Sequence, residues 1–299
     1  MKELLFFLGA VCFAALSCTK EKTDYEGVTD SVTPGHNVFK EAANIHIGGY
    51  DISVEALHGA FYKGYNEIRV KITDNTTNGK VDVADVTFLP ITTDADGGTG
   101  SCPHRYELAY RPDSNDYSGY SVFTGESHVD GTWALAIGFT VANQTLTAKL
   151  PITVQEQPNK NLNMTAFTGK DDEQYIIALV APLRPKVAEN ELVAGIYRLD
   201  STDPSLLSYT EVGGYTLMLD PRMPEPSMGN HSSPNNVDLT QQTDGLYHGV
   251  VNYTMTGNWT LNFIMQNEDG RIVKGTEVPT DFTPGIEGVK SELYIDVLF

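Results

Sequence analysis

Cysteine is scarce in this sequence, with only three among 299 residues. Cys12 lies within an N-terminal apolar run that we expect to be removed on export, and Cys18, two residues after the run, is expected to be modified. Cys102 is then left without a partner within the chain. A fold held by a disulfide framework is therefore excluded, although an exported protein could form one. Three interpretations of Cys102 stay open: a buried small side chain, a free thiol or a metal ligand.

Positive charge is also scarce. The chain has 20 Lys and Arg against 39 Asp and Glu, which gives a formal net charge of −19, and its basic residues occur singly. Binding to nucleic acid or to an anionic membrane surface requires a basic patch, so the sequence argues against both classes of partner.

Long hydrophobic runs are missing after the N-terminus. The run Leu4–Leu16, preceded by Lys2, is too short to span a bilayer and has the length of a signal-peptide core. It ends in Ala15-Leu16-Ser17-Cys18, which resembles the lipobox of bacterial lipoproteins. The resemblance implies that residues 1–17 are a signal peptide and that Cys18 carries lipid. The alternative is an ordinary secretory signal with a chance cysteine.

Residues 18–43 are polar and contain Gly27, Pro34 and Gly35, so we predict a flexible tether. Tethers that are charged and acidic at their far end accompany surface export in some Gram-negative lipoproteins. The expected localisation is the outer membrane, anchored through the lipid on Cys18, with the periplasmic and the cell-surface face both left open.

Helical periodicity is missing as well, and short β-rich runs alternate with turn signals instead. This pattern predicts an all-β chain built as a sandwich rather than from βαβ units. The expected strands of the first half are 50–57, 67–73, 81–89, 119–124, 132–141 and 146–154.

The second half repeats the first at offsets of 124 to 131 residues. Asn66-Glu67-Ile68 matches Asn190-Glu191-Leu192, and Gly131-Thr-Trp133-Ala-Leu135 matches Gly257-Asn-Trp259-Thr-Leu261. Both tryptophans thus occupy one repeat position, where a large aromatic ring would fill a sandwich core. We therefore predict two tandem immunoglobulin-like β-sandwich domains, 44–156 and 165–299, joined by a polar linker near 155–163.

The segment 221–234 is the best candidate for chemistry. It contains Met223, Met228 and His231 together with four prolines, which would stiffen the loop. Thioether sulfur and imidazole are ligands suited to copper, Cu(I) in particular. A weaker second pair is Cys102 with His104. The alternatives are that the methionines fill space over the end of the sandwich or that the loop contacts a partner.

This segment, followed by Asp244-Gly-Leu-Tyr-x-Gly249 and the Gly-x-Trp-x-Leu motif, resembles the YtkA-like and FixH-like domains of bacterial envelopes. The resemblance covers roughly 215–270 and implies a small immunoglobulin-like sandwich; some members are linked to copper handling. This chain departs from a complete soft-metal set. Its first copy has Thr92, Gly97 and Gly100 in place of the Met, Met and His, and its second has Ser233 in place of Cys102.

No nucleotide-binding loop, G-x-S-x-G, H-E-x-x-H or C-x-x-C motif is present, so we expect no enzyme. The leading hypothesis is a non-enzymatic envelope lipoprotein that binds a ligand, with copper as the best-motivated one. The alternative is a structural or adhesive module that contacts a protein or glycan without metal. Exposed loop tyrosines would favour that alternative, and the candidates are Tyr106, Tyr110 and Tyr117.

Overall fold

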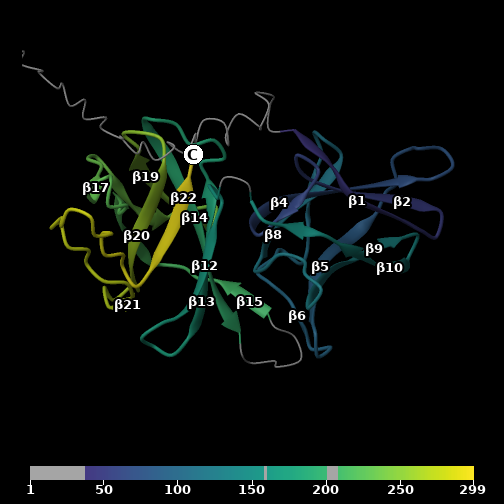
Figure 1. The fold of residues 1–299 in the computed structure, drawn as a ribbon. Coiled ribbons are helices and arrows are strands. Elements are labelled where there is room, and N and C mark those ends of the chain that lie inside the picture. The colour runs from purple at the N-terminus through teal and green to yellow at the C-terminus, as the bar shows by residue number, and fades with distance from the viewer. Residues whose placement is uncertain (1–37, 158–159, 201–207) are drawn as a thin grey trace, which may run out of the picture.

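The computed structural model describes residues 38–157, 160–200 and 208–299. The predicted signal peptide, the lipid-bearing Cys18 and most of the predicted tether lie outside these residues. Within them every regular element is a β-strand, and no helix is long and apolar enough to cross a membrane. The predicted all-β class with two sandwich domains is confirmed (Figure 1).

The first domain packs two sheets around one core. The first sheet has the order β1 (Phe39–Ile47), β2 (Tyr50–Leu57), β4 (Gly64–Asp74), β8 (Asp116–Phe123), β7 (Ala109–Arg111), and the second has the order β10 (Gln144–Ile152), β9 (Gly131–Val141), β5 (Ala84–Asp94), β6 (Thr99–Gly100). A short parallel pair, β3 (Phe61–Tyr62) with β11 (Val154–Gln155), closes one end. Alternate residues of β2 and β4 are buried, as expected for strands with one face on a core.

The prediction for the tether was wrong at its end. Strand β1 begins at Phe39 and pairs with β2 through Ile47, so the first domain starts before residue 44. The sequence hid this strand because none of its residues is fully buried: Ala42, Ala43, Ile45 and Ile47 are only partly buried against the core, and a bulge between Glu41 and Ala43 interrupts the alternation.

The second domain folds one continuous sheet over its core. Its path runs β12 (Met164–Thr168), β13 (Gln174–Ala181), β14 (Glu189–Asp200), β19 (Tyr247–Asn252), β18 (Val237–Gln241), β16 (Thr216–Met223), β20 (Asn258–Gln266), β21 (Ile272–Lys274). Three strands lie off this path: β15 (Ser208–Glu211) pairs with β14, β17 (His231–Ser232) with β16, and β22 (Tyr294–Leu298) with β20. In the first domain β9 pairs with β10. In the second domain the equivalent strand β20 pairs with both β21 and β22, and an insertion separates these two strands.

The internal repeat recurs in hydrogen bonds as well as in sequence. Asn66 bonds the backbone N–H and C=O of Tyr62 and the carbonyl of Gly64. Asn190 makes the same three bonds, to Lys186 and Ala188. Each buried amide therefore satisfies backbone groups of the turn that precedes its strand.

The strand register repeats as well. Thr92 pairs with Gly100 in the first domain and Met223 with His231 in the second, both offset by 131 residues.

The glycines of the two Tyr-x-Gly motifs permit a close approach of the neighbouring strand. A Cβ on Gly119 would lie 2.5 Å from Leu108 Cδ2, and one on Gly249 would lie 2.5 Å from the Val237 carbonyl oxygen. These glycines are thus required by packing against the segment that precedes β7 and against β18.

The two domains also pack against each other. Ile176 and Ala178 of β13 and Tyr197 of β14 form a buried cluster with Tyr120 and Val122 of β8. Because β13 covers its own core with one face and the first domain with the other, five consecutive residues from Tyr175 are buried. Figure 1 shows β12 and β13 on the side of the second domain that faces the first.

Polar contacts border this interface. The Tyr120 hydroxyl donates to Glu211 Oε1 at 2.7 Å, and Arg105 lies 3.9 Å from the same carboxylate. Burial and the adjacent carboxylate raise the pKa of Tyr120 well above its usual range, so its hydroxyl stays a proton donor.

Candidate functional site

The predicted methionine–histidine loop connects β16 to β17. Met223 ends β16 and pairs in register with His231, which begins β17. Met228 packs against the edge of the core in between. The structure therefore brings the three predicted residues to one end of the second sandwich.

Their side chains serve the fold there. Met223 is 2% exposed and belongs to the core cluster, and its Cε lies 2.8 Å from where a Cβ on Gly257 would stand. The missing side chain of Gly257 thus makes room for the methionine. The Nε2 atom of His231 hydrogen-bonds Thr254 Oγ1 at 2.8 Å, and its ring lies edge-on to Trp259 with centroids 6.0 Å apart.

The insertion between β21 and β22 packs against this loop. Gly288 N–H donates to the Pro224 carbonyl at 2.7 Å, and Asn230 Nδ2 donates to the Pro279 carbonyl at 3.1 Å. Two polar contacts therefore hold the loop in its conformation.

The weaker predicted pair, Cys102 and His104, is also engaged in structural contacts. The Cys102 thiol is fully buried beside Ser121 Oγ at 3.4 Å, and burial raises its pKa to about 12. His104 Nδ1–H donates to the backbone carbonyl of Cys102 at 2.7 Å, and burial lowers the pKa of its ring. A thiol that stays protonated is a poor metal ligand and a poor nucleophile.

Among the described residues, no group of three or more His, Cys, Asp or Glu side chains lies where it could hold a metal ion. Of Met223, Met228 and His231, only His231 belongs to these residue types.

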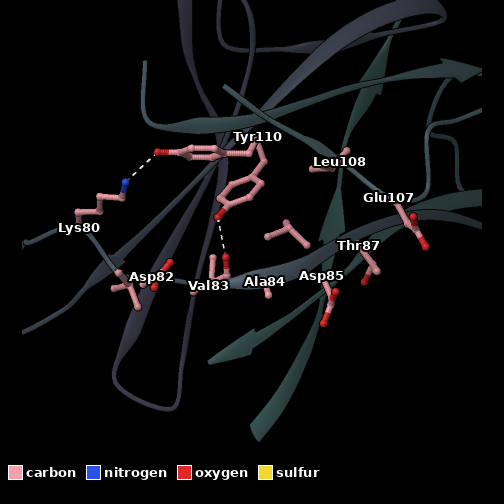
Figure 2. A pocket seen from close by; sticks show the side chains of 12 residues that line it. Lys80, Asp82, Val83, Ala84, Asp85, Thr87, Glu107, Leu108 and Tyr110 are labelled. Carbon is pink, nitrogen blue, oxygen red and sulfur yellow. Dashed lines mark hydrogen bonds between the residues drawn. The ribbon is translucent and has the colours of Figure 1, made fainter. Parts of the chain in front are cut away.

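A different feature stands out in the first domain. A groove of about 460 Å³ opens between the chain that leads into β5 and the edge strand β7 (Figure 2). This volume lies in the range of small-ligand sites. Its lining comprises Lys80, Val81, Asp82, Val83, Ala84, Asp85, Val86, Thr87, Glu107, Leu108, Tyr110 and Tyr117.

The two tyrosines of the groove are held by different contacts. Tyr117 donates its hydroxyl to the Val83 carbonyl at 2.9 Å, and burial, ahead of the neighbouring Tyr110, raises its pKa. The Tyr110 hydroxyl accepts from Lys80 Nζ at 2.8 Å and donates to Asn115 Oδ1 at 3.1 Å, while 43% of the residue stays exposed. The outer ring is thus fixed in place and open to a ligand (Figure 2).

At the equivalent place in the second domain, a glutamine stands where the first domain has Tyr110. Tyr247 repeats the bond of Tyr117 by donating to the Val212 carbonyl at 2.7 Å. Its cross-strand partner is Gln241, in the position that Tyr110 holds opposite Tyr117. Gln241 Oε1 accepts from Gly214 N–H at 2.9 Å and its Nε2 donates to the Gly245 carbonyl, so this side chain spans the opening.

The groove and its equivalent in the second domain also differ at one residue with a left-handed backbone conformation. Two residues after Val83 stands Asp85, and two residues after Val212 stands Gly214; both have positive φ, 51° and 77°. Glycine adopts this conformation freely, whereas a side chain there is strained by roughly 1 kcal/mol. The first domain therefore keeps a carboxylate at the groove where the backbone favours glycine.

Tyr106, Tyr110 and Tyr117 were predicted as exposed loop residues; Tyr106 and Tyr110 are exposed, but Tyr110 lies on β7 and the half-buried Tyr117 on β8. Sequence reasoning missed Lys80, Asp82, Asp85 and Glu107. The differences between the repeats, Tyr110 against Gln241 and Asp85 against Gly214, could have indicated the groove. These positions can be aligned only with the strand register, because the segment before β16 shows little similarity to the segment before β5.

No family model matches the chain, and no curated protein matches it. Among solved structures, it resembles a DUF4785 family protein from Legionella pneumophila at 8% identity and a TM-score of 0.24, covering 76% of this chain. The chain spans 55% of that protein's length. It also resembles a chimeric titin Z1Z2 tandem at 14% identity and a TM-score of 0.16, covering 70% of this chain and 88% of the other. Likenesses at this level carry no argument about function.

Proposed function

We propose that the protein is a non-enzymatic, lipid-anchored module of the bacterial cell envelope whose first domain binds an exported partner in the groove beside Tyr110. One observation carries this proposal: the first domain has a groove beside Tyr110, whereas at the equivalent place of the second domain the Gln241 side chain bonds both Gly214 and Gly245. A fixed, exposed tyrosine ring supports it, because amphipathic aromatic side chains are favoured in binding surfaces.

The test transplants the second domain's residues into the first. Arrays of synthetic peptides and of glycans are probed with the ectodomain from Thr19 onward and with the Asp85→Gly/Tyr110→Gln variant. We expect ligands that bind the wild type and are lost in the variant, with the melting temperature kept within a few degrees. If no ligand depends on the groove, the proposal fails.

Anchoring is tested separately through Cys18. We expect a full-length Cys18→Ala variant to lose incorporation of a labelled fatty acid and to leave the membrane fraction. Lipid labelling that persists in this variant would contradict a lipidated Cys18.

Copper binding at the methionine–histidine loop is a second candidate, favoured by the register pairing of Met223 with His231. A competition titration with Cu(I) compares the ectodomain with the Met228→Ala/His231→Ala variant, in which the buried Met223 is left intact. About one equivalent of copper that the variant loses would support it. Binding no greater than that of the variant would end it.

A further inference from the structure

We propose that the ligand of the first-domain groove is an extended, positively charged peptide segment, with a basic side chain held between the Tyr110 ring and the groove carboxylates. This inference rests on the proposed function and narrows its partner to one chemistry. It combines the charge of the lining, the fixed aromatic ring and the free edge of β7.

The charge of the lining is negative and uncompensated. Asp82, Asp85 and Glu107 are exposed, and none of them forms an ion pair of 4.0 Å or less with a described basic residue. The one cation of the lining, Lys80, donates to the Tyr110 hydroxyl. Three carboxylates against one ammonium favour a cationic ligand and repel an anionic one.

The aromatic ring provides a platform for the same charge. Lys80 Nζ lies 5.1 Å from the Tyr110 ring centroid, so a cation already lies close to this ring. An arginine guanidinium of a ligand could stack on the exposed ring and reach a carboxylate with its N–H groups. Lys80 and Asn115 hold the ring in place beforehand, which lowers the entropy lost on binding.

The backbone beside the groove suits an extended chain. β7 is the last strand of its sheet and pairs with β8 alone over Ala109–Arg111. The segment just before β7 is already paired with β5, since Phe88 N–H donates to the Tyr106 carbonyl at 2.8 Å and Leu108 N–H donates to the Val86 carbonyl at 2.9 Å. This pairing ends where β7 begins, so an extended peptide in the groove can hydrogen-bond the free edge of β7, as in strand addition.

A neutral glycan is the competing ligand, since it too could stack on a tyrosine. Neutralising the carboxylates distinguishes the two ligands. A neutral amide can still accept a hydrogen bond from a sugar hydroxyl, but it no longer attracts a cationic side chain. We favour the peptide because the lining combines unpaired charge with a free strand edge.

The test uses the ectodomain from Thr19 onward and two fluorescein-labelled nonapeptides, one alternating Arg with Thr and one alternating Glu with Thr. Fluorescence anisotropy is recorded at 20, 150 and 500 mM NaCl. We expect binding of the Arg peptide alone, weakened at least tenfold between the lowest and highest salt. We also expect at least a tenfold loss in Asp85→Asn/Glu107→Gln, a variant without volume change.

A matched control is needed because the whole chain is acidic. Glu268→Gln/Asp269→Asn removes the same charge from an exposed turn of the second domain. It should bind the Arg peptide within twofold of wild type. An equal loss in this control would mean that net charge alone attracts the peptide, and the inference would be overturned.

The remaining outcomes separate the inference from the proposed function. If a neutral glycan such as a chito-oligosaccharide binds, depends on Tyr110 and is indifferent to Asp85→Asn/Glu107→Gln, the groove is a site but the peptide is wrong. If neither probe class depends on the groove, both proposals fail. If the Arg peptide binds in the groove, it should shift the amide signals of Leu108 and Tyr110 in ¹⁵N-edited spectra.

Discussion

The two domains share a scaffold but differ at both of their candidate sites. Their equivalent asparagines, Asn66 and Asn190, make the same three hydrogen bonds, and their Trp-bearing strands β9 and β20 stand at the same place. The groove is open in the first domain, and a methionine-rich loop held by an insertion exists only in the second. The two domains therefore differ at loops and strand edges, while their buried hydrogen bonds are the same.

The comparison also shows why the domains are not independent. The apolar outer face of β13 is covered by the first domain, and without it Ile176 and Ala178 would face water. Burying apolar surface is worth roughly 25 cal/mol per Å², so separating the domains would lower the stability of both.

The largest predicted effect is the loss of stability when the core tryptophan of one domain is replaced. Each domain has one tryptophan, both nearly fully buried, and Trp133→Ala or Trp259→Ala should destabilise its own domain by about 3–5 kcal/mol. The remaining tryptophan then reports the other domain by fluorescence during urea unfolding. Because the interface is apolar, we expect the midpoint of the intact domain to fall too. An unchanged midpoint would contradict coupling; the exposed Val129→Ala serves as control.

The next prediction tests whether the equivalent asparagines contribute equally to the free energy of unfolding of their domains. Asn66→Ala and Asn190→Ala each remove a buried amide that bonds three backbone groups, most of them part-buried. A lost hydrogen bond of this kind costs about 1–3 kcal/mol, so we expect a loss of about 2 kcal/mol in each domain. Urea unfolding of both variants should give values within about 1 kcal/mol of each other. A cost confined to one domain would show that the hydrogen bonds are equivalent in geometry alone.

Much of the fold could be predicted from the sequence because strand periodicity and repeat spacing are local. The expected strand 50–57 coincides with β2, and the expected strand 132–141 lies within β9. The interface could not be predicted. The buried run from Tyr175 was visible, but nothing local says whether its second face meets the first domain or another partner.

The candidate sites were harder to predict for a different reason. Residue type and spacing singled out Met223 and His231, but whether the sulfur points into the core depends on the space left by Gly257. The two domains differ here because the Tyr110 ring lines the groove of the first domain, whereas the Gln241 side chain of the second bonds Gly214 and Gly245 across the equivalent place. Such a difference depends on side-chain direction and strand register, which a spacing pattern does not contain.

A smaller effect sharpens the comparison at the left-handed position. Gly214→Asp should destabilise the second domain by about 1 kcal/mol, because it strains the backbone and places a carboxylate near Glu268. Asp85→Gly should instead leave the first domain within about 0.5 kcal/mol of wild type, since relief of strain offsets the gain in chain entropy. Thermal unfolding of both variants measures this asymmetry. A loss from Asp85→Gly as large as that from Gly214→Asp would mean that Asp85 stabilises the fold.

The smallest effect is a dependence on pH at His248, a position that carries a titratable side chain only in the second domain. Burial lowers the pKa of His248, but hydrogen bonds to Glu191 at 2.9 Å and Asp244 at 3.0 Å outweigh it, so the pKa is raised overall. The equivalent position in the first domain is the uncharged Ser118, so the comparison concerns this position alone. A raised folded pKa stabilises the protein fully below the unfolded value near 6.5, and this contribution disappears as the pH rises through the folded pKa. The stability lost in His248→Gln should therefore be larger at pH 5.5 than at pH 8.5, by less than about 1 kcal/mol because the site is partly exposed. Urea midpoints at the two pH values measure it, and Ser118→Gln should show no such difference. A loss in His248→Gln that grows at high pH would reverse the sign and remove the ion pairs as its cause.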